Sequence, residues 1–74
     1  MFKTNLRNAK LSKAHLASAD LSYAYLTRAY LKDADLSGAD LSNANLEYAS
    51  LPFANLVGAN LSNAYLSSVY QVLF

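Results

Sequence analysis

The side chains that could perform catalysis are few and stand at regular positions. Histidine is the commonest general base, and His15 is the only histidine in the chain. Serines recur at Ser22, Ser42 and Ser62, and a serine hydroxyl becomes a nucleophile only beside an activating base. No base accompanies these serines in the sequence, and His15 has no identified nucleophile. We therefore expect no enzymatic activity.

Carboxylates offer a second kind of chemistry. Asp20, Asp35 and Asp40 could ligate a metal ion or present a negatively charged surface. A metal site needs several converging ligands, and the chain has no cysteine and only scattered carboxylates. We expect neither a metal nor a cofactor.

Composition bounds the remaining options. The chain has 74 residues, enough for one domain over 1–74, and a net charge of +1, which predicts no strong attraction to nucleic acid or membranes. No apolar run approaches the roughly 18 residues that a membrane-spanning helix needs. The absence of cysteine fits a reducing compartment, so we expect a cytoplasmic protein.

A five-residue repeat organises all of these positions. Leucine occurs at every fifth residue from Leu6 to Leu66, and alanine stands two residues before nearly every leucine. Thr4 and Val69 replace the alanine at the two ends. We call the residue between alanine and leucine the outward position, and the two residues after leucine the first and second corner residues.

The repeat excludes the ordinary elements. In a helix, residues five apart advance by about 500°, so the leucines would spread around the whole rod. In a straight strand they would alternate between opposite faces. A chain that turns once in every repeat keeps alanine and leucine inside and the outward residue outside. Stacked coils of such a chain form a solenoid with a leucine core.

Exterior charges favour four repeats per coil. Residues 20 apart are then stacked, which places His15 over Asp35 and Arg28 over Tyr48. Three repeats per coil would stack like charges, such as those of Lys13 and Arg28. Four repeats also stack Asp20 over Asp40, which is the one unfavourable pair.

The segments Ala34-Asp35-Leu36-Ser37-Gly38 and Ala44-Asn45-Leu46-Glu47-Tyr48 resemble the pentapeptide repeat family, whose consensus is Ala-(Asp/Asn)-Leu-x-x. The resemblance covers nearly the whole chain. It implies an all-β fold, a right-handed quadrilateral β-helix, here with about three and a half coils. The chain departs from the consensus at seven outward positions: Lys10, His15, Tyr25, Tyr30, Ser50, Tyr65 and Tyr70.

The exposed aromatic and apolar side chains predict a protein-interaction surface. Tyrosine is favoured both in cross-coil packing and at binding surfaces. The C-terminal segment 69–74 is either a cap over the last coil or a surface for self-association. The candidate interface comprises Tyr25, Phe53, Tyr65, Tyr70, Val72, Leu73 and Phe74. We expect a non-enzymatic structural or protein-interaction module whose partner the sequence does not identify.

Two nucleic-acid hypotheses are weaker. Arg7, Lys10, Lys13, Arg28 and Lys32, with Tyr25 and Tyr30, have the chemistry to bind nucleic acid, but a solvated surface is the simpler interpretation. Some pentapeptide repeat proteins protect or inhibit DNA gyrase by presenting an acidic surface that mimics DNA. Asp20, Asp35 and Asp40 would have to carry that function here, which is the alternative hypothesis.

Overall fold

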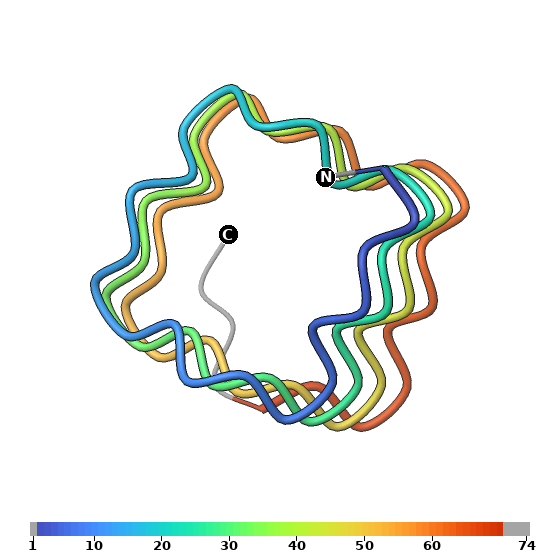
Figure 1. Cartoon of the computed structure of the whole chain (residues 1–74). Coiled ribbons are helices and arrows are strands. Elements are labelled where there is room, and N and C mark those ends of the chain that lie inside the picture. Colours follow the sequence, from blue (N-terminus) through green and yellow to red (C-terminus); the bar gives the residue numbers. More distant parts are fainter. Residues whose placement is uncertain (1, 71–74) are drawn as a thin grey trace.

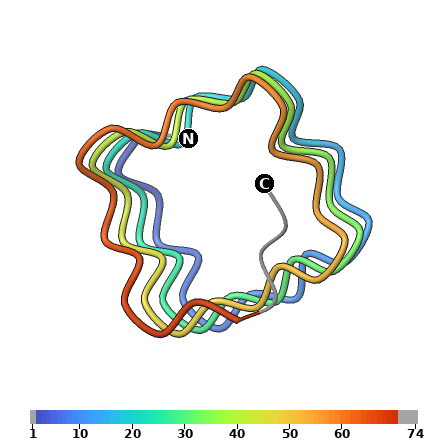
Figure 2. The same cartoon turned by 180° about the vertical axis from the view of Figure 1, so that it is seen from behind.

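The chain winds into a four-sided coil around a single axis (Figures 1 and 2). The computed structural model describes residues 2–70. Ten parallel β-bridges connect successive coils, and each joins residues 20 positions apart, beginning with Asn5 to Tyr25 and ending with Ser50 to Tyr70. Each coil therefore contains four repeats, as the exterior charges predicted. Consecutive coils lie directly over one another in both views.

The secondary structure consists of isolated β-bridges and two-residue turns. Each outward residue from Asn5 to Tyr70 forms a single-residue β-bridge, and each pair of corner residues forms a turn. Within residues 2–70 there is no helix and no strand longer than one bridged residue. The repeat therefore produces the predicted alternation of a short extended piece and a corner.

Backbone hydrogen bonds follow the same rule in every inner repeat. The alanine N–H donates to the preceding leucine carbonyl and closes the turn, while the outward residue donates to the coil before. The leucine and the second corner residue donate to the coil after. In the repeat 39–43 these bonds are Ala39 to Leu36 at 3.0 Å, Asp40 to Ala19 at 2.9 Å, Leu41 to Asn60 at 2.8 Å and Asn43 to Ser62 at 2.9 Å.

The first corner residue is the exception, since its N–H donates to no backbone carbonyl within the described residues. An Asp or Asn at the outward position supplies the acceptor instead. Asp40 Oδ1 accepts the N–H of Ser42 at 3.0 Å and the Ser42 hydroxyl at 2.6 Å. Such bonds are Asx turns, in which a short acidic or amide side chain satisfies the backbone two residues later. An Asp or Asn at the outward position therefore has a hydrogen-bonding role in this chain.

Throughout residues 2–70 the second corner residue has a positive φ. Twelve non-glycine residues there have φ between 57° and 62°, and Gly38 and Gly58 have 67° and 72°. A positive φ at the third residue of a four-residue turn is typical of type II turns and costs about 1 kcal/mol for residues with a Cβ. The solenoid tolerates this cost because each such N–H in the inner coils is hydrogen-bonded to the next coil.

Leucine and alanine line the axis. The side chains from Leu21 to Ala54 in these two positions are buried, and six central leucines are less than 2% exposed. The equivalent residues near the two ends of the solenoid are only partly buried, and Leu66 is 41% exposed. The predicted inward assignment is confirmed, and burial falls from the centre of the solenoid to its ends.

Pro52 shows how a repeat can omit the Asx turn. Its outward residue is Ser50, which is not an Asp or Asn, and its first corner residue is a proline, which has no N–H to satisfy. Proline is also favoured at the second residue of type II turns. This repeat therefore lacks the N–H donor, so it needs no Asp or Asn acceptor at the outward position.

This compensation predicts opposite effects for proline at two serines. Ser12 lies in the same corner as Pro52, and its outward neighbour is Lys10, so Ser12→Pro should raise the free energy of unfolding by about 0.4–1 kcal/mol. Ser42→Pro removes two hydrogen bonds to Asp40 and should cost about 1–3 kcal/mol. Urea denaturation of both variants would measure the difference, and equal effects would contradict the role of the Asx turns.

Candidate interaction surface

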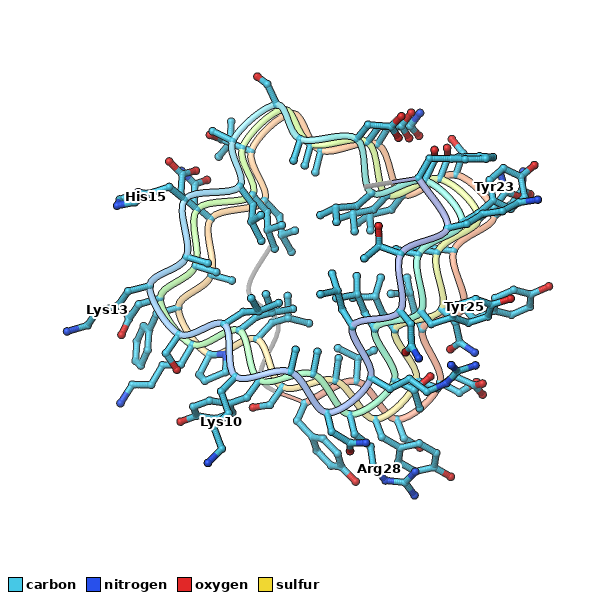
Figure 3. The ribbon with its side chains drawn as sticks, viewed as in Figure 1. Lys10, Lys13, His15, Tyr23, Tyr25 and Arg28 are labelled. Atoms are coloured by element: carbon cyan, nitrogen blue, oxygen red, sulfur yellow. The ribbon has the colours of Figure 1, made fainter. Side chains whose placement is uncertain are left out.

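The outward residues form four faces, each a column running along the axis. Face 1 holds Asn5, Tyr25, Asn45 and Tyr65; face 2 holds Lys10, Tyr30, Ser50 and Tyr70; face 3 holds His15, Asp35 and Asn55; face 4 holds Asp20, Asp40 and Asn60. Figure 3 shows these side chains projecting away from the axis, with Tyr25, Lys10 and His15 on three different sides. Corner residues stand between adjacent faces.

Asx turns are concentrated on faces 3 and 4. Five of the six outward residues there accept the N–H of the first corner residue, and His15 is the exception. On faces 1 and 2, as far as the structure describes them, only Asn5 and Asn45 do so. The hydrogen-bonding pattern that defines the repeat is thus retained on one half of the molecule and largely replaced on the other.

Aromatic residues occupy the half that has lost the Asx turns. All six tyrosines lie on faces 1 and 2 or at corners that border them, and Phe53 stands at the corner between faces 2 and 3. The most exposed of these side chains are Phe53 at 70%, Tyr65 at 61% and Tyr70 at 54%. Four predicted interface residues, Tyr25, Phe53, Tyr65 and Tyr70, therefore belong to one continuous half of the surface.

Two arginines stack on tyrosines of this half. The Arg28 guanidinium lies 5.0 Å from the centre of the Tyr48 ring, as the stacking of four repeats per coil predicted. The Arg7 guanidinium lies 4.2 Å from the Tyr25 ring. These two residues are 18 apart, and they meet because the long arginine side chain reaches diagonally to the next coil. The stacking of residues 20 apart therefore did not predict this contact. Such contacts contribute about 0.5–1 kcal/mol at exposed sites.

The three aspartates lie on faces 3 and 4. Asp20 and Asp40 are bridge partners on face 4, and Asp35 is bridged to His15 on face 3. The Ser37 hydroxyl and N–H, which both donate to Asp35 Oδ1, lower the pKa of Asp35, and nearby His15 contributes less. The Ser22 hydroxyl and N–H lower the pKa of Asp20 in the same way. The stacking of residues 20 apart does not predict that these aspartates accept hydrogen bonds from the following serine. The recurring Asx-Leu-Ser pattern is the sequence signal of that role.

These shifts predict acid sensitivity. A carboxylate whose folded pKa is below its unfolded value of 3.8 stabilises the fold above that pH, and the contribution is lost as the pH falls through the folded pKa. The double variant Asp20→Asn, Asp35→Asn keeps both Oδ1 acceptors but cannot titrate. Its melting temperature should fall less than that of the parent between neutral pH and about pH 2.5. A parallel decline in both proteins would refute the linkage.

The residues considered for catalysis do not form a nucleophile–base arrangement. His15 is exposed on face 3, and its bridge partner Asp35 has its Oδ1 engaged by Ser37. Ser22 and Ser42 donate their hydroxyls to Asp20 and Asp40 rather than to a base. Among residues 2–70 no three His, Asp or Glu side chains are grouped to hold a metal ion. No helix in the described part of the chain is long and apolar enough to span a bilayer.

The remaining predicted interface residues, Val72, Leu73 and Phe74, lie outside the described residues, as does most of segment 69–74. The cap hypothesis for this segment stays a prediction. Leu66, which is 41% exposed, extends the apolar surface of the last described coil.

Comparison with known families agrees with the geometry. The family model for pentapeptide repeats matches residues 1–38 and 24–63 with eight copies of the repeat. The chain therefore belongs to the pentapeptide repeat family, whose members are β-helical repeat proteins and generally non-enzymatic structural modules. A search of curated proteins returns no match.

Proposed function

We propose that this chain is a non-enzymatic interaction module that presents faces 1 and 2 to a protein partner. We further infer a right-handed quadrilateral β-helix with about three and a half coils as the scaffold. A rigid solenoid holds side chains at fixed spacing, which lowers the entropic cost of forming an interface. The proposed function is therefore to hold the side chains of faces 1 and 2 at fixed positions for a protein partner.

The single observation behind this proposal is the exchange of Asx turns for tyrosines. Each Asx turn is a hydrogen bond, which contributes about 0.5–1.5 kcal/mol to stability. Tyr25, Tyr30 and Tyr65 give up that bond and leave large, partly exposed rings on the surface. Departures from a local stability rule are typical of functional surfaces, and tyrosine is enriched at protein interfaces.

Restoring the consensus tests the proposal. The variant Tyr25→Asn, Tyr65→Asn recreates two Asx turns, so its free energy of unfolding should stay within about 1 kcal/mol of the parent value. Its capacity to capture a partner from the source cell should nevertheless be lost. Val57→Ser is the matched control, because Val57 is 76% exposed at the opposite corner between faces 3 and 4. Undiminished capture by the tyrosine variant would refute the proposal.

The DNA-mimic hypothesis stays a prediction. Its acidic surface would comprise Asp20 and Asp40 on face 4 and Asp35 on the neighbouring face 3. The triple Asp→Asn variant keeps every Asx acceptor and removes all three charges. If the hypothesis is correct, the parent protein should alter supercoiling by gyrase and the triple variant should not.

A further inference from the structure

Face 2 and its two corners carry an uneven distribution of charge along the solenoid axis. Coil 1 spans 4–23, coil 2 spans 24–43, coil 3 spans 44–63, and coil 4 begins at 64. The five cations of this surface are all in coils 1 and 2: Arg7, Lys10, Lys13, Arg28 and Lys32. Asp33 in coil 2 and Glu47 in coil 3 are its only anions, and no charged residue follows Glu47. One end of the surface is therefore cationic.

The other end of the same surface is aromatic. Tyr48 and Phe53 stand at the two corners of coil 3, and Tyr70 lies on face 2 in coil 4. These rings are 45%, 70% and 54% exposed, respectively. Cations are attracted to the faces of aromatic rings. The cationic end and the aromatic end are therefore chemically complementary.

The chain already uses this complementarity within itself. Arg28 stacks on Tyr48 across coils 2 and 3. Lys10, Lys32, Phe53 and Tyr70 have no cation–π partner among the described residues, although they belong to the same surface. Lys10 and Tyr70 lie three coils apart on face 2, so only a second molecule can bring them together. Lys32 and Phe53 lie at one corner in adjacent coils, and no cation–π contact joins them within the described residues.

We propose that face 2 and its corners bind the same surface of a second copy, with the two solenoid axes antiparallel. This inference goes beyond the interaction function proposed above, because it names a second copy as the partner of face 2. A two-fold axis in the contact plane, perpendicular to the solenoid axis, places coil 1 opposite coil 4 and coil 2 opposite coil 3. Each of the two corners then lies opposite the same corner of the second copy. Lys10 lies opposite Tyr70, Lys32 opposite Phe53, and Arg28 opposite Glu47 and Tyr48 of the second copy.

Charge selects this orientation over the parallel one. If the two axes ran in the same direction, coils of equal number would meet and the two corners would exchange places. Arg7 would then face Lys13, and Arg28 would face Lys32. Like charges placed opposite one another cost several kcal/mol in an interface. The antiparallel arrangement separates the two cationic ends and closes the assembly at two copies, as isologous contacts do.

A charge-reversal pair tests both the contact and its orientation. Arg28→Glu places a second carboxylate opposite Glu47 of the other copy, and Glu47→Arg places a second guanidinium opposite Arg28. Sedimentation velocity over a concentration series should show that each variant alone dimerises at least about tenfold more weakly than the parent. An equimolar mixture should recover dimers, because both contacts then join opposite charges. Mixing changes no contact within a chain, so recovery cannot arise from improved folding.

Two controls complete the experiment. Phe53→Ser should weaken the dimer in every combination, whereas Val57→Ser on the opposite corner should leave the parent's dimerisation unchanged. Circular dichroism should show that each variant keeps the parent's spectrum. A single-stranded oligonucleotide at low salt tests the alternative that the cations of face 2 and its corners bind a polyanion.

The outcomes are distinct. A parent protein that is monomeric up to millimolar concentration overturns the dimer, as does a mixture that fails to recover it or an oligonucleotide that binds while dimers are absent. None of these results affects capture of another protein by Tyr25 and Tyr65 on face 1. Conversely, a dimer that forms while the tyrosine variant keeps full capture supports the inference and refutes the proposed role of face 1.

Discussion

Leu36→Asp should abolish folding. Leu36 is 0% exposed in the second coil and has one coil on each side of it. An unpaired carboxylate at that position loses hydration and finds no partner among the leucines and alanines of the axis, at a cost of at least several kcal/mol. A domain of this length has a total stability of only about 4–11 kcal/mol. The penalty is therefore comparable with the whole stability of the fold.

Circular dichroism and thermal melting would measure this effect. Leu36→Met is the matched control, since it conserves volume and polarity and should cost less than about 1.5 kcal/mol. An aspartate variant that melts at the parent's temperature would show that leucine does not face the axis. Because neighbouring coils share hydrogen bonds, we expect the whole solenoid to unfold and not only the second coil.

Leu41→Ala should cost about 2–5 kcal/mol, whereas Leu66→Ala should cost less than about 1 kcal/mol. Leu41 is 0% exposed with coils above and below it, and its truncation leaves a cavity that the rigid ladder cannot collapse. Leu66 is 41% exposed in the last described coil, so its truncation removes less buried surface. The effect of one substitution thus depends on its distance from the end of the solenoid.

Urea denaturation of the two alanine variants would measure the gradient. A similar loss at both positions would mean that something else covers the last coil, which is what the cap hypothesis for segment 69–74 requires. A small loss at Leu41 would contradict close packing along the axis. The slope of the transition reports whether the coils unfold as one unit.

The two halves of the surface differ in how the N–H groups of the first corner residues are satisfied. On faces 3 and 4, Asp20, Asp35 and Asp40 each satisfy a corner N–H and accept a serine hydroxyl. On faces 1 and 2, tyrosines leave the equivalent N–H groups without that acceptor. Pro52 is the one position where the loss is compensated within the repeat, because it has no N–H. Tyr25, Tyr30 and Tyr65 have no such compensation, which is why we propose them as binding residues.

The sequence by itself determined the repeat, the inward direction of leucine and alanine, and four repeats per coil. These follow from spacing and from the charges that stacking brings together, because a period of five is compatible with neither a helix face nor a straight strand. It also indicated that Arg28 would meet Tyr48. The aspartates and asparagines matched the consensus at an outward position, but spacing alone did not predict their hydrogen bonds to the corner N–H groups.

Only the tertiary structure decided which side chains work together. Stacking placed Arg7 on Tyr25, engaged each aspartate of faces 3 and 4 with a serine, and collected the tyrosines on adjacent faces. The physical reason is that these contacts depend on side-chain reach and on the direction of each N–H, whereas the repeat period specifies only the path of the backbone. Coiling then converts positions far apart in sequence into neighbours in a column, and the surface emerges from that arrangement.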